Sequence, residues 1–450
     1  ENLKKKGYFF RTESDTEVFL ALFLDKGTKC FDELNGIFSA FIFDYQSKKV
    51  FLVRDHIGVK PLYFKFNRNK KELIFASEIK AFKAFVNLKP NIANLSEFLC
   101  FGENSEEHTI YFGINQLQPG NFLEMSLINN SNIQINEYFT LVDLYNNSLN
   151  KLDSDFQEEF FNERIFTDLI FQQFDINVPM GVQFSGGLDS SFLTSLIMKK
   201  KFFQTYSATI PNFEESEEYW QKKVIEYLSI KNKQVALKSE AFSEKNISNS
   251  IYMNDAPLQH PNFLSCFSLC SEAKKDKIKV LISGDGADEF FSGYKWFISA
   301  PEQSSIDIIR RSAFNGINDI RILLKQKSIN LKSRISYLDG LKVDENKNHS
   351  LLKSHLYSQR FYLQKWLHRQ DRTGMSNGIE IRVPFCDLNL IKYYLGLRLR
   401  NLDLIAGTKK DLKILAESFL PKEIIYRNKI GFPIPLEDLF AKGGSLFHIS

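Results

Sequence analysis

Short apolar segments separated by polar turns dominate the first part of the chain. Residues 38–44 and 49–54 are rich in Phe, Val and Ile and flank the polar segment 45–48, a pattern typical of a β-hairpin. Further strands are predicted at 62–66, 72–76 and 121–125. A capping box, with Ser14 three residues before Glu17, predicts a helix that runs through Leu24.

A different pattern begins near residue 156, where long helical segments alternate with short apolar strands. Strands are predicted at 178–184, 204–210 and 280–283, with helices such as 217–228 and 263–275 between them. This alternation predicts an α/β fold with a doubly wound parallel sheet, which binds ligands at the carboxyl ends of its strands. Residues 305–450 are predicted to be mostly helical.

The change of pattern predicts two domains with a linker between them. The chain turns polar and rich in Asn from about residue 139 to 155, which is typical of a connecting segment. We therefore predict domains at 1–138 and 156–450, and a linker at 139–155.

Composition and charge exclude several classes of protein. The 450 residues carry 58 basic and 54 acidic side chains, and a net charge of +4 is too small to indicate a nucleic-acid or anionic-membrane partner. No apolar run approaches the roughly 18 residues that a membrane span needs. The five cysteines are scattered and odd in number, which favours reduced thiols in the cytoplasm.

The first candidate site is a Ser-Gly-Gly turn between a predicted strand and a predicted helix. At Ser185, Gly186 and Gly187 the backbone can approach a ligand closely, since two of these residues have no Cβ. Backbone amides and a helix start near Leu188 would form a positive pocket for pyrophosphate. No Lys follows the glycines, so this is not a kinase-type phosphate loop. It resembles the pyrophosphate loop of enzymes that split ATP into AMP and pyrophosphate.

A second loop, Ser283-Gly-Asp-Gly-Ala-Asp-Glu289, repeats the order of strand, glycine turn and helix. Both loops would lie at the same edge of a doubly wound sheet, so Asp189 and Asp288 would converge there. Two carboxylates together with phosphate oxygens suit Mg²⁺. The alternative is that each aspartate only stabilises the start of its own helix, by about 1 kcal/mol.

Cationic segments near the C-terminal end are a third candidate. Gly407-Thr-Lys-Lys-Asp-Leu-Lys413 is one of them, and the segment from Arg427 to Pro433 is another. A lysine directed at the α-phosphate would stabilise the charge that grows during adenylation. Composition alone fits an ordinary solvated face equally well.

Four motifs in order give a specific resemblance: the loops at 185–191 and 283–289, the segment Asp371-Arg-Thr-Gly-Met-Ser-Asn-Gly-Ile-Glu-Ile-Arg-Val-Pro-Phe385, and Arg427-x-Lys-x-Gly-Phe-x-x-Pro. They resemble glutamine-dependent asparagine synthetases, whose C-terminal domain adenylates a β-carboxylate before ammonia displaces AMP. The resemblance implies an adenine nucleotide alpha hydrolase-like domain with extra helices, ATP and Mg²⁺ as cofactors, and small-molecule substrates. It also allows a homodimer.

The resemblance implies a role for each candidate residue. The residues implied to bind pyrophosphate are Ser185, Gly186, Gly187, Asp189 and Ser190. Those implied to contact the nucleotide are Gln183, Ala208, Ser283 and Gly284. Mg²⁺ is implied to bind to Asp189 and Asp288. Asp285 occupies the position of an acidic catalytic-site residue, where some family members have Glu, and Lys409 that of the catalytic lysine.

The first half resembles the glutaminase domain of the same family, which is an αββα sandwich of the N-terminal-nucleophile hydrolase type. The similarity lies in Ser14-Asp-Thr-Glu-Val18, Arg54-Asp-His-Ile-Gly-Val-Lys-Pro-Leu-Tyr63 and Ala76-Ser-Glu-Ile-Lys80. It implies that Asp15 binds the α-amino group of glutamine. Simple capping of a helix is the alternative role for Asp15.

The nucleophile of that domain is missing from the sequence. Such hydrolases use a cysteine at the first residue, but residue 1 is Glu and the nearest cysteine, Cys30, follows the Asp15 motif. We expect the chain to be a fragment that lacks the first third to half of the glutaminase domain. This polypeptide is therefore not expected to hydrolyse glutamine.

The segment expected to bind the acceptor departs from the family pattern. Segment 255–262 carries no Arg, although a dicarboxylate site normally uses a guanidinium. Aspartate is the default acceptor, and another carboxylate, such as a sugar acid in surface-polysaccharide synthesis, is the variant. A tRNA-modifying enzyme would share the 185–191 loop but would leave 1–138 unexplained. A degenerate nucleotide-binding relative would fit the missing nucleophile but not the two aspartate loops and Lys409.

Overall fold

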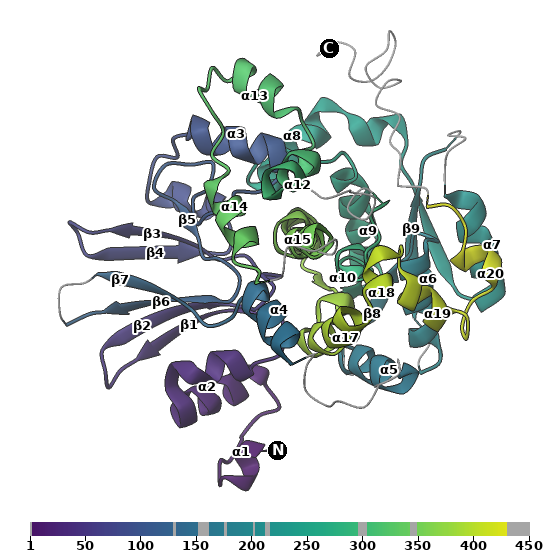
Figure 1. Cartoon of the computed structure of the whole chain (residues 1–450), viewed down its shortest axis with the longest axis horizontal. Coiled ribbons are helices and arrows are strands. Elements are labelled where there is room, and N and C mark those ends of the chain that lie inside the picture. The colour runs from purple at the N-terminus through teal and green to yellow at the C-terminus, as the bar shows by residue number, and fades with distance from the viewer. Residues whose placement is uncertain are drawn as a thin grey trace.

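The computed structural model describes residues 2–128, 132–151, 162–174, 178–200, 203–211, 217–295, 304–342 and 349–429. Two β-sheets and their connections form one side of the molecule, and a larger helical body built around a parallel sheet forms the other (Figure 1). The mixed α/β class predicted from the two hydrophobic patterns is confirmed.

The first half contains two antiparallel sheets. One has the order β1-β2-β6-β7 and the other β4-β3-β5. Their strands are β1 (Ser39–Asp44), β2 (Lys49–Arg54), β3 (Tyr63–Asn67), β4 (Glu72–Ala76), β5 (Asn115–Gln116), β6 (Asn121–Ser126) and β7 (Ile133–Glu137). The predicted hairpin is confirmed, because β1 pairs with β2 from Ser39–Arg54 to Asp44–Lys49.

Alternating side chains of β2 and β6 build a separate core on each face of their sheet. Leu52 and Leu123 point toward the second sheet and pack with Phe64. On the other face, helix α2 (Asp15–Lys26) and the 3₁₀ turn that follows it place Phe23 against Phe51. Helix, sheet and sheet therefore form three layers in the described part of this half.

The predicted start of α2 is confirmed, although the capping box is only partly formed. The Ser14 hydroxyl accepts a hydrogen bond from the amide of Thr16 at 3.2 Å. Glu17 accepts instead from the amides of Arg11 and Thr12, at 2.9 and 2.8 Å. Its carboxylate therefore holds the chain that enters the helix.

The second half is built around a five-stranded sheet of order β10-β9-β8-β11-β12, in which all neighbouring strands are parallel. Its strands are β8 (Met180–Gln183), β9 (Gln204–Thr209), β10 (Asn232–Ala236), β11 (Val280–Ile282) and β12 (Glu380–Arg382). The predicted parallel sheet is confirmed, and its strands β8 and β11 are wholly buried.

Helices surround this sheet and fill the C-terminal region (Figure 1). The helices near the sheet are α5 (Glu163–Gln172), α6 (Leu188–Met198), α7 (Glu218–Leu228), α8 (Glu244–Asn254), α9 (Phe263–Lys275) and α10 (Ala287–Phe290). Those that follow are α12 (Ser305–Ser312), α13 (Ile317–Leu323), α14 (Lys332–Asp339), α15 (His349–Tyr357), α16 (Leu363–Met375), α17 (Leu388–Arg400), α18 (Leu402–Ala406), α19 (Lys410–Ala416) and α20 (Lys422–Ile425). The short helices α1 (Asn2–Lys5) and α3 (Ile92–Phe101) belong to the first half.

The predicted linker at 139–155 stays a prediction, and part of it is helical. Residues 141–150 form helix α4 (Leu141–Asn150), capped by the Thr140 hydroxyl, which accepts from the amide of Asp143 at 2.9 Å. Leu141 and Tyr145 are buried in the main core of the second half. The polar composition belongs to the exposed face of an amphipathic helix, while residues 152–161 lie outside the described part. The domain limits at 138 and 156 stay predictions.

Four strands were not predicted, and all of them lie at sheet edges: β5, β7, β10 and β12. An edge strand is partly solvated, so its sequence lacks a continuous apolar run. Asn232-Lys-Gln-Val-Ala236, for example, is nowhere fully buried.

Buried charges fix the two halves to each other. The guanidinium of Arg334 on α14 is fully buried and pairs with Glu97 on α3 at 3.1 Å and with Glu103 at 2.8 Å. Its Nη1 also donates to the hydroxyl of Tyr357 at 2.9 Å. Burial raises the pKa of Glu103 to about 7, so the ionised form of this carboxyl depends on its cation.

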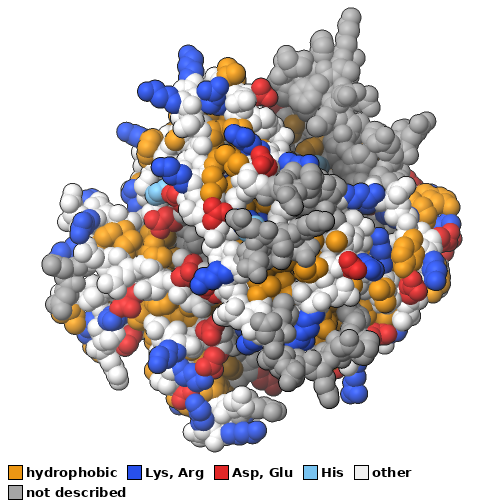
Figure 2. All heavy atoms as spheres, in the orientation of Figure 1, with side chains coloured by type: hydrophobic (Ala, Val, Ile, Leu, Met, Phe, Trp, Pro, Cys, Tyr) orange, Lys and Arg blue, Asp and Glu red, His pale blue; other side chains and the backbone are white. Residues whose placement is uncertain are grey.

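Charged side chains of both signs are interspersed over the face of the molecule that Figure 2 shows. No helix in the described part of the chain combines the length and hydropathy needed to cross a membrane.

Replacement of Arg334 by alanine should weaken the junction between the halves. Removing one partner of a buried ion pair leaves the other charge without compensation and costs about 3–5 kcal/mol. We expect R334A to lower the thermal unfolding midpoint clearly, whereas R310A, at an exposed position of α12, should leave it within about 1 °C. Equal midpoints for R334A and the wild type would contradict the role of this ion pair.

Candidate active site

Both predicted loops lie at the carboxyl edge of the parallel sheet. Residues 185–187 follow β8 and lead into α6, while residues 283–286 follow β11 and lead into α10. Strands β8 and β11 are neighbours, with Val182 opposite Ile282. A Cβ on Gly284 would lie 3.2 Å from Cβ of Asp189, so the second loop touches the first turn of α6. The predicted convergence of the loops is confirmed.

The Ser-Gly-Gly turn is shaped by close packing and by hydroxyl contacts. Gly186 has φ +77° and lies so near the backbone of Gln221 on α7 that an added Cβ would be 2.8 Å from its nitrogen. The Ser190 hydroxyl accepts from the amide of Ser185 at 3.1 Å. Gly187 is the N-cap of α6 and has no side chain to cap the first turn, which leaves that helix end open to an anion.

Lys409 connects the two loops through a shared ion pair. Its Nζ lies 2.6 Å from a carboxylate oxygen of Asp189 and 2.6 Å from one of Asp288. Burial opposes the charge on Lys409, but the two carboxylates outweigh it and raise the pKa of the lysine. Lys409 also adopts a left-handed backbone conformation, with φ +51°, and its amide donates to the carbonyl of Phe291 at 3.0 Å. Strain of this kind in a non-glycine residue is concentrated at functional sites.

The two aspartates differ in their surroundings. Lys429 is a second cation for Asp288, at 2.7 Å, so the attraction of both lysines outweighs burial and lowers the pKa of this carboxyl. Burial and the nearby Asp288 raise the pKa of Asp189 despite Lys409. The two carboxylates therefore share one lysine, but their pKa values are shifted in opposite directions.

Arg427 supports the first loop from the C-terminal side. Its Nη2 donates to the carbonyl of Gly186 at 3.1 Å and pairs with Glu217 at 2.9 Å. Burial raises the pKa of Glu217 to about 7, against the effect of Arg427. The predicted cationic segment thus reaches the site as far as Lys429, and residues 430–433 of that motif lie outside the described part of the chain.

The residues available to a metal ion fit Mg²⁺. One carboxylate oxygen of Asp189 contacts Lys409, while the other, Oδ1, is buried without a hydrogen-bond partner. An unpartnered anionic oxygen beside a second carboxylate is a favourable ligand set for a hard cation that keeps waters and phosphate oxygens. Within the described residues no group of three or more His, Cys, Asp or Glu side chains forms a ready-made metal cage. The metal role of Asp189 and Asp288 stays a prediction.

Asp285 lies in a polar network that the sequence did not indicate. Arg369 on α16 pairs with its Oδ1 at 2.9 Å, and the side-chain amide of Gln370 donates to its Oδ2. Gln370 also donates to Gln183 and to the hydroxyl of Ser283, both at 3.0 Å. Helix α16 thus connects the ends of β8 and β11 through one side chain.

The structure places the other candidate residues at separate points. Ala208 lies at the end of β9, next to β8, and its carbonyl accepts from Gln221 at 3.1 Å. Asp15 lies in the exposed first turn of α2, in the other half of the molecule, and its carboxylate accepts from the Thr16 hydroxyl at 3.3 Å. Its glutamine-binding role stays a prediction. No sequence pattern indicated Gln221, Arg369 or Gln370, which are ordinary helix residues until the fold brings them to the sheet.

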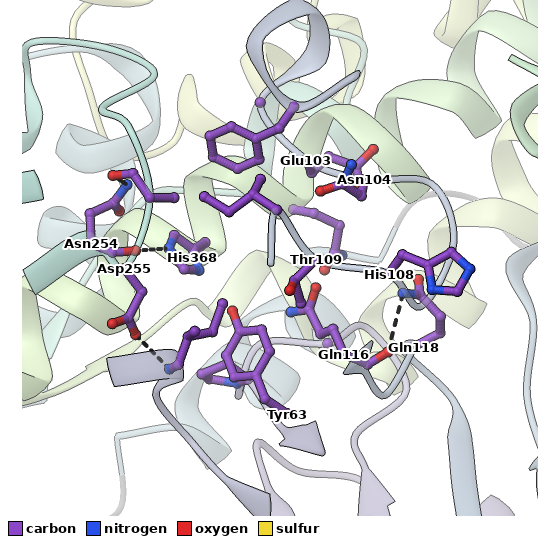
Figure 3. A pocket seen from close by; sticks show the side chains of 18 of the residues that line it. Tyr63, Glu103, Asn104, His108, Thr109, Gln116, Gln118, Asn254, Asp255 and His368 are labelled. Atoms are coloured by element: carbon purple, nitrogen blue, oxygen red, sulfur yellow. Dashed lines mark hydrogen bonds between the residues drawn. The ribbon is translucent and has the colours of Figure 1, made fainter. Parts of the chain in front are cut away.

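A cavity lies between the two halves (Figure 3). Tyr63 and Thr109 line it from the first half, while Asp255 and His368 line it from the second. His368 donates to the carbonyl of Asn254 at 2.8 Å, and burial lowers its pKa to about 3, so its imidazole is neutral at pH 7. The first half contributes aromatic, hydroxyl and amide groups to the walls, and the second half contributes amide, carboxylate and imidazole groups.

Comparison with known proteins identifies similarity in each half. The family described as asparagine synthase matches residues 163–448, and the glutamine amidotransferase domain matches residues 1–139. Asparagine synthetase [glutamine-hydrolyzing] 3 of Bacillus subtilis (strain 168) is 28% identical over 482 residues, covering 99% of this chain and 75% of its own length.

A second relative covers less of its own sequence. Asparagine synthetase [glutamine-hydrolyzing] 2 of the same organism is 29% identical, and the match spans 90% of this chain and 56% of that protein. Among solved structures, an NMN synthetase from Francisella tularensis is 14% identical with a TM-score of 0.24, over 53% of this chain and 95% of that chain. With a TM-score this low, the structural similarity supports no conclusion about function.

Gly293 gives a direct test of the shared ion pair. A Cβ at this position would lie 1.8 Å from Oδ1 of Asp288 and 2.5 Å from Cε of Lys409, so G293A must displace both groups. We expect G293A to reduce any ATP-dependent activity by roughly 100-fold or more, since site electrostatics act through fixed positions.

The matched control is G396A on α17, where an added Cβ meets nothing within 4 Å. This variant should keep full activity. It should also unfold at a slightly higher temperature, because alanine is the better helix former by about 0.5–1 kcal/mol. Full activity of G293A would contradict the importance of the Asp288–Lys409 contact.

Proposed function

The chain belongs to the asparagine synthase family, and we propose that it catalyses the ATP-dependent conversion of aspartate to asparagine. In the first step, an oxygen of the aspartate β-carboxylate attacks the α-phosphorus of ATP and pyrophosphate leaves. In the second, the nitrogen of ammonia attacks the activated carbonyl carbon, AMP leaves and the nitrogen loses a proton. Asparagine, AMP and pyrophosphate are the products.

The ion pair of Lys409 with Asp189 and Asp288 is the observation that carries this proposal. It places a buried ammonium between the two glycine loops, at the edge of the sheet where phosphates bind in this class of fold. Oxygens of a triphosphate would compete with the carboxylates for this cation. Lys409 would then stabilise the negative charge that develops around the α-phosphorus.

The neighbouring groups divide the remaining tasks. We assign the pyrophosphate to Ser185, Gly186, Gly187 and Ser190, and the adenosine contacts to Gln183, Ala208, Ser283 and Gly284. Mg²⁺ held by Asp189 and Asp288 would neutralise charge on the departing pyrophosphate. Asp285 is held by Arg369 and Gln370, and we assign it a catalytic role on the acceptor side of the site.

Glutamine is the proposed nitrogen donor, because residues 1–139 match a glutamine amidotransferase domain. Free ammonia is proposed to serve the same synthetase site directly. Burial raises the pKa of all five cysteine thiols, to about 12 at Cys30 and about 11 at Cys100, so none is an activated thiolate. Five free cysteines also support a cytoplasmic location.

A different carboxylate acceptor is the second candidate. The segment 255–262 contains His260 and Asn262 and no Arg, which is the feature that favours a sugar acid. The chemistry of activation would be the same, since any carboxylate oxygen can attack the α-phosphorus.

The proposal is tested by supplying the purified protein with ATP, Mg²⁺, ammonium chloride and L-aspartate. We expect asparagine and pyrophosphate to form in equal amounts, with release that depends on aspartate. Pyrophosphate release with D-galacturonate but not with L-aspartate would show that the acceptor is a sugar acid. Release with neither acid would overturn it.

Asp189→Asn should abolish catalysis without unfolding the protein. The substitution keeps the shape of the side chain but removes the charge that would face Mg²⁺, so we expect pyrophosphate release to fall by roughly 100-fold or more. Asp168→Asn, at an exposed position of α5, is the matched control and should retain the wild-type rate.

The thermal shift produced by Mg²⁺·ATP provides a second readout. The shift should be smaller in D189N than in the wild type and unchanged in D168N. An unaltered rate and shift in D189N would refute the metal role of Asp189.

A further inference from the structure

A buried guanidinium that the proposed mechanism does not use contacts both segments that carry the shared ion pair. Arg398 belongs to α17, is 1% exposed, and lies where α10, α18 and α19 meet (Figure 1). A buried guanidinium must find its partners within the protein, because leaving it unpaired is costly. The partners of Arg398 lie on the segments that carry Asp288 and Lys409.

On one side, Arg398 holds the chain that follows Asp288. Its Nη1 donates to the carbonyl of Phe290, and its Nη2 donates to the hydroxyl of Ser292 at 3.0 Å. The amide of Gly293 donates back to the carbonyl of Asp288 at 2.7 Å and closes the turn. Ser292 has a left-handed backbone, with φ +57°, which persists only where surrounding contacts maintain it.

On the other side, Arg398 holds the segment that carries Lys409. Its Nε lies 3.3 Å from Oδ2 of Asp411, a buried carboxylate two residues after Lys409. Its Nη2 also donates to the carbonyl of Leu404 on α18 at 2.8 Å. Burial raises the pKa of Asp411 and Arg398 opposes that rise, so the charge of this carboxylate depends on its cation.

The two segments also meet directly. The amide of Lys409 donates to the carbonyl of Phe291, which lies between the two residues that accept from Arg398. The ring centre of Phe291 lies 5.6 Å from Cζ of Arg398. One guanidinium therefore contacts three successive residues near Asp288 and residues on both sides of Lys409.

We infer that Arg398 is a positioning residue, which fixes the ammonium of Lys409 against Asp288 so that both groups are in place when the triphosphate binds. This inference rests on the proposed function and deepens it, because it assigns a task to a residue that touches no substrate. The planar guanidinium suits this task, since it donates in several fixed directions at once. A lysine would keep the charge but not all of these directions.

A neutral imidazole completes the surroundings of Arg398. Nε2 of His355 lies 3.4 Å from its Nη1, and burial together with Arg398 lowers the pKa of His355 far below its usual value. Nδ1 of the same ring lies 2.5 Å from the hydroxyl of Tyr145 on α4. The charge of Arg398 is thus balanced by Asp411, and the imidazole adds no second cation.

The test compares R398Q with R334Q at a temperature well below the unfolding midpoints of both variants. Arg334 is the matched control, because it is an equally buried guanidinium whose carboxylate partners belong to the junction of the two halves. We expect R398Q to lower kcat for pyrophosphate release by roughly 10-fold or more, which corresponds to about 1.4 kcal/mol, and to leave the KM for aspartate within about 2-fold. R398K should recover part of this loss, and R334Q should keep kcat within about 2-fold of the wild type.

The reactivity of Lys409 toward acetic anhydride gives a readout that needs no turnover. In the wild type Lys409 is 6% exposed and paired with two carboxylates, so it should react slowly. We expect R398Q to raise its rate of acetylation by roughly 10-fold or more, measured by mass spectrometry relative to the exposed Lys222. R334Q should leave this ratio unchanged.

The outcomes separate this inference from the proposed function. If the wild type forms pyrophosphate and R398Q keeps its kcat, or loses it with unaltered acetylation of Lys409, the positioning role is wrong while the function stands. If the wild type forms no pyrophosphate with L-aspartate or D-galacturonate, the proposed function is wrong and the acetylation ratios alone decide the inference. If R398Q does not fold, R398K and S292A decide it by the same criteria, with R334K as the control.

Discussion

The contact of one buried ammonium with two carboxylates is the interaction on which the rest of the site depends. Lys409 lies 2.6 Å from an oxygen of each aspartate, and these aspartates belong to different loops of the parallel sheet. Without the cation, two buried negative charges would repel each other at the carboxyl edge. The ion pair therefore both closes the site and holds the charge that a triphosphate would use.

Several local features are consequences of this contact. Gly293 has no Cβ because Asp288 and Lys409 occupy that space, and the left-handed backbone of Lys409 is anchored on the carbonyl of Phe291. Arg427 fixes the first loop through Gly186. The C-terminal helices thus contribute cations to loops formed more than a hundred residues earlier, and the large core behind them makes the arrangement rigid.

Much of this architecture could be predicted from the sequence. The glycine turns after apolar strands identified the loops of Asp189 and Asp288, and the parallel sheet required them to meet. The edge strands β7, β10 and β12 could not be predicted, since half-solvated strands lack an apolar run. Helix α4, within the predicted linker, could not be predicted, because its polar face dominates its composition. Arg369 gave no local signal, because its meaning depends on Asp285, which is distant in the sequence.

The central claim is that this site splits ATP between its α- and β-phosphates. It is tested most directly by phosphorus NMR of the purified protein with ATP, Mg²⁺, L-aspartate and ammonium chloride. The account predicts that resonances of AMP and pyrophosphate grow together while ATP disappears, and that they do not grow without aspartate. Formation of ADP and orthophosphate, or ATP that remains intact in the complete mixture, would contradict it.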